Sequence, residues 1–295
     1  MATQNEVKDD PAYIACLDHG FVGLVDSMGD DDSIVQAARV SYGKGTKKVN
    51  EDRHLIRYLL RHYHTTPFEM VEFKFHMKLP LFAARQLIRH RTANVNEYSG
   101  RYSEMPNEFY IPELSALAPQ SKSNHQGRDG EMDGTLARAA QAYIDDHSGG
   151  AYACYQALLG NDETYRFPID GGIAKELARM VLPLNNYTEW YWKCDAKNIF
   201  HFLNLRDDPH AQWEIRVFAE AMASLIQPII PVAFEAFEDY WHQAATVSRM
   251  ELDFLKVLVG RALLDSNEKD FDSWAEVFGI KGRELLEFKS KIGVE

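Results

Sequence analysis

Apolar side chains recur at helical spacing in the first strongly patterned part of the chain, residues 52–64. They repeat every three or four positions, as in an amphipathic helix, at Leu55, Ile56, Leu59, Leu60 and Tyr63. Pro67 ends this pattern, because the residue before a proline avoids the α region. From Phe68 to Met77 apolar and polar positions alternate instead, which predicts a β-strand with one buried face.

A second group of elements follows Pro80, a residue that suits the start of a helix. This helix is predicted over residues 81–91, with Ala84, Leu87 and Ile88 on one side. An aromatic-rich run over residues 186–194 predicts another strand. Asp195 can cap the helix after it, which we expect to run to Arg206.

Most of the remaining chain has helical periodicity. Helices are predicted over residues 135–160, from the cap Asp170 to a stop before Pro183, and over 211–227 and 231–242, with two more after residue 250. Residues 112–134 are rich in loop-forming side chains and predict a long loop. Strands mixed with a larger number of helices favour an α+β fold.

Composition narrows the class of protein. The 295 residues include 32 Lys+Arg against 44 Asp+Glu, a formal net charge of −12, so a surface that binds nucleic acid or an anionic membrane is not expected. Three cysteines cannot form a disulfide framework, which indicates a reducing compartment, and without a Cys-x-x-Cys pair no cysteine-based zinc site is expected. No apolar run approaches the ~18 residues of a membrane span, and the start of the chain is polar and acidic. We therefore expect a soluble, cytoplasmic protein.

Positive charge is concentrated between Arg85 and Arg101 in this acidic chain. Arginine can bind phosphate or carboxylate oxygens with two parallel hydrogen bonds, so an anionic ligand is expected here. The alternative is a solvated helix end whose basic side chains complement the helix dipole. Arg179 and Arg206 lie near the ends of two further predicted helices. A buried arginine needs an anion or a polarised carbonyl as its partner, whereas His201 is more typical of a hydrogen-bonded core residue.

The arginine-rich segment resembles the signature of the flavin-dependent thymidylate synthases, the ThyX family. The matching residues are Arg89, His90, Arg91, Asn96, Glu97, Ser99 and Arg101. Further blocks, in family order, lie at residues 37–42, 64–69, 179–188 and 202–216. The resemblance covers residues 35–240, and Asn94 stands where the family usually has serine.

The resemblance implies an enzyme, a methyltransferase that converts dUMP to dTMP. In the family, 5,10-methylenetetrahydrofolate supplies the carbon, and FAD reduced by NADPH supplies the hydride. The implied fold is α+β, an antiparallel sheet packed with helices, assembled as a homotetramer with active sites shared between subunits. The catalytic domain would be residues 1–250, with a loop insertion at about 113–134, and residues 251–295 would form a helical C-terminal extension.

The resemblance also implies roles for individual residues. The implied dUMP-binding set is Gln86, Arg89, Glu97, Ser99, Gly100, Arg101, Arg179 and Arg206. The implied FAD-binding set is Thr66, Glu69, Arg89, His90, Arg91, Glu97, Asp195, Lys197 and His201. Arg206 corresponds to the family residue that contacts the uracil edge, so it is the expected catalytic residue, and no metal ion is expected. We expect Ser99 to bind substrate, because a nucleophilic serine needs an adjacent general base.

Two other functions remain open. A metal-dependent nucleotide phosphohydrolase could draw its ligands from His62, His64, His90, Asp207, Asp208 and His210. It would leave the arginine blocks without a role. A non-catalytic helical scaffold could instead bind protein partners through residues 251–295, and it would bind neither flavin nor nucleotide.

Overall fold

The computed structural model describes residues 1–40, 49–122, 127–161, 171–264 and 268–294. They form two compact units, Met1–His242 and Gln243–Glu295. Some features predicted from the sequence lie outside the described residues. These are Ser41 and Tyr42 of the block at 37–42, the helix cap Asp170, and residues 123–126 of the long loop.

One antiparallel sheet forms the centre of the larger unit. Its strand order is β1-β2-β3-β5-β4, and each neighbouring pair is antiparallel. The strands are β1 (Tyr13–Cys16), β2 (Gly20–Met28), β3 (Glu72–Pro80), β4 (Asn94–Glu97) and β5 (Tyr187–Asp195). The sheet and its helices confirm the α+β fold, although the sequence patterns predict neither β1, β2 nor β4.

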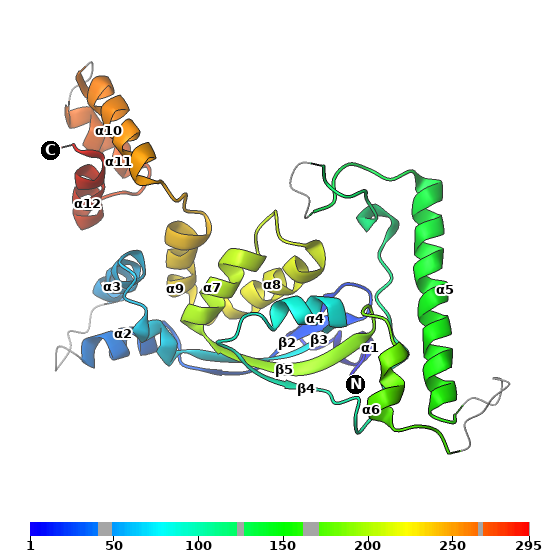
Figure 1. Cartoon of the computed structure of the whole chain (residues 1–295). Coiled ribbons are helices and arrows are strands. Elements are labelled where there is room, and N and C mark those ends of the chain that lie inside the picture. The colour runs from blue at the N-terminus through cyan, green and yellow to red at the C-terminus, as the bar shows by residue number, and fades with distance from the viewer. Residues whose placement is uncertain (41–48, 123–126, 162–170, 265–267, 295) are drawn as a thin grey trace. The chain divides into compact units, whose positions relative to one another are not determined.

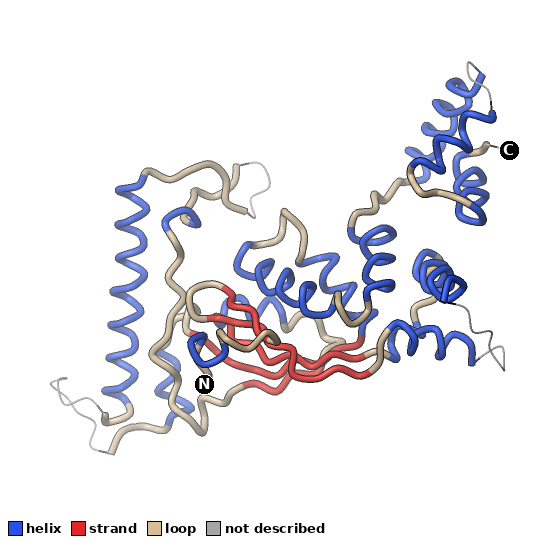
Figure 2. The backbone as a smooth tube through the Cα atoms, turned by 180° about the vertical axis from the view of Figure 1, so that it is seen from behind, coloured by secondary structure: helices blue, strands red, loops and turns tan. Residues whose placement is uncertain are grey.

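Helices α4, α7 and α8 cover one face of this sheet (Figures 1 and 2). The α-helices of the larger unit are α1 (Gln4–Val7), α2 (Asp31–Arg39), α3 (Val49–Arg61), α4 (Leu81–Leu87), α5 (Gly134–Leu158), α6 (Lys175–Ala178), α7 (Ala196–Arg206), α8 (Trp213–Ile226) and α9 (Pro231–Phe237). Short 3-10 helices are η2 (Thr66–Met70), η3 (Leu114–Ala116) and η4 (Arg179–Val181). A π-helical turn, η5 (Glu238–His242), follows α9.

The hydrophobic core lies between the sheet and helices α7 and α8. Its largest members from the strands are Phe73, Phe75, Met77, Trp190 and Trp192. Those from the helices are Phe200, Phe202, Phe218 and Met222. Complete burial of one such side chain stabilises the fold by about 1.5–3 kcal/mol. This layer therefore holds α7, and the polar residues at its ends, firmly against β5.

Strand β3 begins at Glu72 instead of Phe68. The prediction is wrong there because Thr66–Met70 forms the 3-10 helix η2, with Pro67 in its first turn. The turn carries Phe68 into the core, where its ring lies 6.4 Å from that of Phe200. Burial of Phe68 therefore overrides the alternating pattern of its neighbours.

Helix α4 ends at Leu87 instead of Arg91. The backbone N–H groups of Arg89 and His90 each donate to a carbonyl only three residues earlier, at 3.3 and 3.1 Å. The chain has to turn at this point because β4, which pairs with β5, begins at Asn94. The arginine-rich segment therefore begins in the last turn of α4 and continues through a non-helical turn into β4.

The predicted helix before Pro183 is also shorter than expected. Gly171 and Gly172 have φ angles of 80° and 64°, in the left-handed region, which a continuing helix does not allow. The helical part begins at Lys175 with α6 and continues as η4. Arg179 is the first residue of that 3-10 turn.

The C-terminal unit contains three helices in its described residues, where the sequence pattern predicts two. They are α10 (Arg249–Leu264), α11 (Glu268–Val277) and α12 (Gly282–Ile292). The rings of Phe271 and Phe288 stack at 6.0 Å, and Lys289 forms an ion pair with Asp272 at 3.1 Å. No helix in the described ranges of either unit has the length and apolarity needed to cross a membrane.

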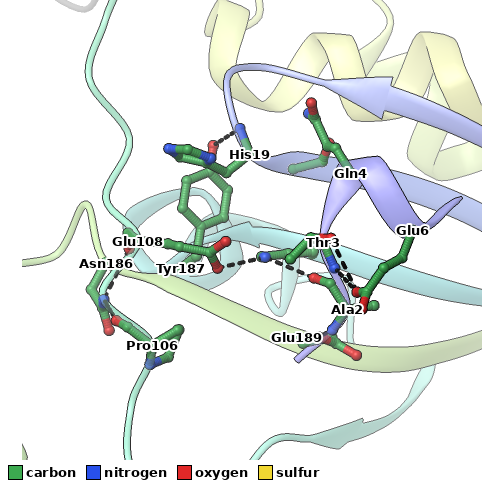
Figure 3. Close-up of polar contacts among 12 residues, drawn as sticks. Ala2, Thr3, Gln4, Glu6, His19, Pro106, Glu108, Asn186, Tyr187 and Glu189 are labelled. Atoms are coloured by element: carbon green, nitrogen blue, oxygen red, sulfur yellow. Dashed lines mark hydrogen bonds and ion pairs between the residues drawn. The ribbon is translucent and has the colours of Figure 1, made fainter. Parts of the chain in front are cut away.

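A buried lysine ties the start of the chain to the sheet. Lys78 on β3 is fully buried, and its Nζ donates to the carbonyl of Ala2 at 2.8 Å and forms an ion pair with Glu108 at 2.5 Å. The backbone N–H of Ala2 donates to Glu189 on β5 at 2.9 Å (Figure 3). Since a buried ammonium needs a counter-charge and hydrogen-bond acceptors, these contacts hold the N-terminal segment on the sheet.

We predict that Glu108→Gln lowers the free energy of unfolding by about 2–3 kcal/mol, because it leaves the Lys78 ammonium buried without its counter-charge. The side chain of Glu108 keeps 22% of its exposure, which makes the effect smaller than for a fully buried pair. The double variant Lys78→Met/Glu108→Gln should recover most of the loss. Urea denaturation measures all three proteins, and a Glu108→Gln protein as stable as wild type would contradict this role.

Candidate active site

The predicted site residues fall into two groups, one at each end of the β4–β5 strand pair. Asn94 pairs with Lys193 and Glu97 pairs with Trp190, in antiparallel register. Residues before β4 therefore lie at the same end of the strand pair as residues after β5. The first group, the α7 end, contains Arg89, His90, Arg91, Asp195 and Lys197 near the strand ends, with His201 and Arg206 further along α7 facing His90. Gln86, on α4, lines a cavity together with Arg206. The second group, the α6 end, contains Ser99, Gly100, Arg101 and Arg179.

Arg206 dominates the α7 end. It is the last residue of α7, it is half-buried, and its Nε donates to Nε2 of His90 at 3.1 Å. Burial lowers the pKa of Arg206 from its ordinary value, but an arginine stays charged near neutral pH. Within the described residues no carboxylate pairs with this guanidinium. A partly desolvated cation of this kind is a strong site for an anion or a polarised carbonyl.

Asp195 acts as the N-cap of α7. Its Oδ1 accepts from the backbone N–H of Asn198 at 2.9 Å, and its Oδ2 accepts from the Asn198 side chain at 2.7 Å. Lys197 donates to the same amide at 3.0 Å. The predicted helix start at Asp195 is confirmed. The two carboxylate oxygens already stabilise the helix, so a flavin contact from this residue would be additional.

Except for Glu97 at the end of β4, the residues predicted for FAD lie towards the α7 end. Thr66 and Glu69 lie on η2, which packs against α7 and precedes β3, and β3 runs antiparallel to β5. Arg89 and Arg91 are exposed in the turn after α4, and Lys197 is in the first turn of α7. A dinucleotide carries a negatively charged diphosphate, so cations in exposed turns beside hydroxyl and backbone groups fit such a cofactor.

The α6 end is built around Gly100. A Cβ at this buried position would lie 2.7 Å from Sδ of Met105 and 3.2 Å from Cδ of Arg179, so only glycine allows their close approach. Arg101 pairs with Glu176 of α6 at 3.2 Å, and Nε of Arg179 is 3.4 Å from the carbonyl of the same residue. Arg101 thus contacts the carboxylate of Glu176 and Arg179 its backbone carbonyl, so two exposed guanidinium groups and one carboxylate leave a local excess of positive charge.

Ser99 and Glu97 also lie on this segment. Oγ of Ser99 accepts from the backbone N–H of Arg101 at 3.4 Å, which is the geometry of a turn and not of a serine activated by a general base. Oε1 of Glu97 accepts from the buried hydroxyl of Thr188 at 2.7 Å. Thr188 belongs to a block that the sequence resemblance includes, but no role was inferred for it.

A cavity of about 1350 Å³ lies beside the C-terminal end of helix α7. It is lined by Gln86 and Arg206, which the sequence resemblance places together in the substrate site. The structure therefore brings these two residues to one surface. On the other sides the cavity is lined by Tyr110, by Arg128 of the long loop and by residues at the start of α8.

Glu214 is a cavity residue that the sequence reasoning missed. It is 3% exposed, and it accepts from Tyr110 at 3.2 Å and Gln212 at 3.0 Å and pairs with Arg128 at 3.0 Å. Burial and the neighbouring Glu214 raise the pKa of Tyr110. The family block at 202–216 contains Glu214 and could have drawn attention to it, whereas nothing in the loop composition singles out Arg128.

Cys16 and Cys194 are buried, and burial raises the pKa of each thiol to about 12. At neutral pH both are therefore protonated and poorly nucleophilic. Cys154 is on α5, away from the strand pair. No cysteine in the described residues takes part in the site assembled here.

Among the described residues, the ligands considered for a metal-dependent hydrolase do not form one cluster. His90 is bonded to Arg206, and His210 pairs with Asp208 at 2.9 Å. The rings of His62 and His64 lie 6.3 Å apart at the end of α3. In the part of the chain that the structure describes, no three His, Cys, Asp or Glu side chains form a group that could hold a metal ion.

Arginines at both ends of an antiparallel strand pair, with a partly desolvated one on a large cavity, are typical of an enzyme that binds an anionic nucleotide. Residues 23–232 match the family model described as thymidylate synthase complementing protein (Thy1). The flavin-dependent thymidylate synthase of Rickettsia conorii (strain ATCC VR-613 / Malish 7) is 51% identical over 274 residues, covering 91% of this chain and 93% of that protein. The one from Ruegeria pomeroyi (strain ATCC 700808 / DSM 15171 / DSS-3) is 50% identical over 278 residues, covering 94% and 87%.

The structure resembles a solved nucleotide methylase as well. The UMP/dUMP methylase PolB from Streptomyces cacaoi, bound with 5-Br dUMP, matches with a TM-score of 0.68 at 34% identity, covering 78% of this chain and 99% of that one. Together with the family match, the similarity to these two synthases and to the methylase structure establishes the family. The chain belongs to the family of flavin-dependent thymidylate synthases, and the resemblance predicted from its sequence is confirmed.

We predict that Gly100→Ala lowers the free energy of unfolding by about 1–3 kcal/mol, because the new methyl group overlaps Met105 and presses on Arg179. Its affinity for a nucleoside monophosphate should fall as well, since Arg179 is displaced. The exposed Gly149→Ala, inside α5 and with nothing within 4 Å of its Cβ, is the matched control: it should raise the free energy of unfolding by about 0.5–1 kcal/mol and leave the dUMP affinity unchanged. Thermal unfolding and titration with dUMP test both, and wild-type behaviour of Gly100→Ala would show that the packing argument is wrong.

Proposed function

We propose that this protein converts dUMP to dTMP, with FAD as its bound cofactor and 5,10-methylenetetrahydrofolate and NADPH as co-substrates. The main support is the family membership together with the half-buried guanidinium of Arg206 on the cavity, which has no carboxylate partner in the described residues. When bound, reduced FAD would supply the hydride and the folate the one-carbon unit. The protein has to bind, orient and polarise these molecules.

The dUMP-binding set is proposed to be Gln86, Arg89, Glu97, Ser99, Gly100, Arg101, Arg179 and Arg206. Arg101 and Arg179 would bind the phosphate, because both exposed guanidinium groups contact the same residue, Glu176, Arg101 through its carboxylate and Arg179 through its backbone carbonyl. Arg206 would contact the uracil edge and stabilise the negative charge that develops when N3 loses its proton, which activates C5. A fixed, partly desolvated cation performs this task without reorganisation during the reaction.

FAD is proposed to lie at the α7 end. Its contacts would come from Thr66, Glu69, Arg89, His90, Arg91, Glu97, Asp195, Lys197 and His201. With the exception of Glu97, these residues gather at one end of the strand pair, which supports a single extended cofactor site. The cations in the exposed turn would neutralise the diphosphate.

A homotetramer with shared active sites is the proposed assembly. The dUMP set is divided between the two ends of the β4–β5 pair. The three steps of β4 alone extend about 10 Å at ~3.4 Å per residue, and the substrate residues lie beyond both ends. A complete site would form where the α7 end of one subunit meets the α6 end of another. The catalytic domain is proposed to be residues 1–250, and the enzyme is proposed to work in the cytoplasm.

The experiment is a flavin and turnover assay on the full-length protein, reconstituted with FAD. We expect a flavin spectrum that bleaches with NADPH under anaerobic conditions, and dTMP when dUMP and methylenetetrahydrofolate are added. UMP is the comparison substrate, because the PolB likeness raises it as an alternative. Persistent lack of bound flavin, or flavin without dTMP, would overturn the proposal.

Two single variants test the proposed residue roles in the same assay. Arg206→Ala should lose about 100-fold or more in turnover, because it removes the preorganised charge. Ser99→Ala should retain measurable dTMP formation, since Ser99 binds and does not attack. A completely inactive Ser99→Ala with normal dUMP affinity would show that the two roles are assigned wrongly.

A further inference from the structure

His90 lies behind Arg206 as seen from the cavity. Arg206 lines the cavity, whereas His90 is not part of its wall. The ring of His90 is held by the edge of Phe202 at 4.9 Å and lies 6.1 Å from the ring of His201, both on α7. Its Nε2 is 3.1 Å from Nε of Arg206. His90 is thus packed on the same helix that carries the arginine.

The chemistry of the two groups fixes the direction of this hydrogen bond. A guanidinium can only donate hydrogen bonds, so Nε2 of His90 has to accept and therefore carries no proton. The remaining proton of the neutral imidazole is then on Nδ1. Arg206 uses Nε for this contact, which leaves its two terminal nitrogens to the cavity that it lines.

We propose that His90 is a positioning residue for Arg206: as a neutral acceptor it fixes the plane of the guanidinium, so that the terminal nitrogens meet the uracil edge. This inference rests on the proposed function, because it gives Arg206 the uracil contact. Orienting Arg206 would be a second role of His90, separate from the flavin contact expected of it. An arginine side chain has many rotamers, and fixing one of them lowers the entropy cost of binding.

The groups around His90 keep its imidazole neutral, which is the form that accepts the hydrogen bond from Arg206. Burial, the Arg206 charge and His201 lower the pKa of His90 to about 4. The groups that face it are therefore one cation, one further imidazole and the apolar ring of Phe202. Because the pKa is lowered, the acceptor form is present at neutral pH and would be lost only as the pH falls towards 4.

The test compares His90→Gln with His90→Leu in the FAD-saturated holoenzyme. Glutamine keeps an acceptor oxygen, so His90→Gln should retain most of the dUMP affinity that His90→Leu loses. Leucine keeps the bulk but removes the acceptor, and dUMP affinity should fall by about 10- to 100-fold, as expected for a hydrogen bond to a charged group. Both variants also lose the flavin contact expected of His90, so flavin content is read from the visible spectrum and the titrations are compared at FAD saturation.

The double variant His90→Leu/Arg206→Lys distinguishes positioning from a general structural role. Lysine has no Nε donor to orient, so in the Arg206→Lys background His90→Leu should cause no further loss of dUMP affinity. The proposal is overturned if His90→Leu lowers dUMP affinity equally in the wild-type and Arg206→Lys backgrounds. It is also overturned if His90→Leu binds dUMP as wild type does, or if His90→Gln loses as much dUMP affinity as His90→Leu. The exposed His147→Leu on α5 is the control for a histidine-to-leucine change.

Failure of this inference can be told apart from failure of the proposed function. If wild-type protein makes dTMP while His90→Leu binds dUMP normally, only the positioning role is wrong. If wild-type protein makes no dTMP, the function is wrong whatever the histidine variants do. Loss of flavin from His90→Leu, with dUMP affinity restored by added FAD, would assign His90 to the cofactor alone and would also overturn the positioning role.

Discussion

The antiparallel pairing of β4 with β5 is the constraint on which the site depends. It places the turn that carries His90 beside the helix that carries Arg206, and it places Gly100 beside Arg179. Neither contact joins residues that are close in sequence, so neither exists without the pairing. The large aromatic side chains of β5 and α7 fix the register, because a shift by one residue would turn Trp190 and Trp192 out of the core.

Positive charge is concentrated locally in this acidic chain. Its net charge is −12, yet several arginines are gathered at the two ends of one strand pair. Some have carboxylate partners, as Arg101 has in Glu176. Arg206 instead bonds a neutral histidine. A neutral partner orients the guanidinium without neutralising it, so its full charge remains for the ligand.

Much of this could be predicted from the sequence, for reasons that differ between elements. β5 and α7 were predictable because aromatic alternation and the Asp195 cap are local signals. The end of α4 was not, since it depends on the pairing of β4 with a strand about a hundred residues later. The family resemblance supplied the site residues, but the Arg206–His90 bond and the burial of Glu214 appear only in three dimensions.

The central claim is that each nucleotide site combines the α7 end of one subunit with the α6 end of another. One chain therefore contributes its two ends of the β4–β5 pair to two different sites. Mixing two inactive variants, Arg179→Ala and Arg206→Ala, under conditions that exchange subunits tests this most directly. We predict that the hybrids regain dTMP formation, because an intact α7 end from one subunit meets an intact α6 end from another. If hybrids form, as judged by differently tagged subunits, and remain inactive, both halves belong to the same chain and the account is contradicted.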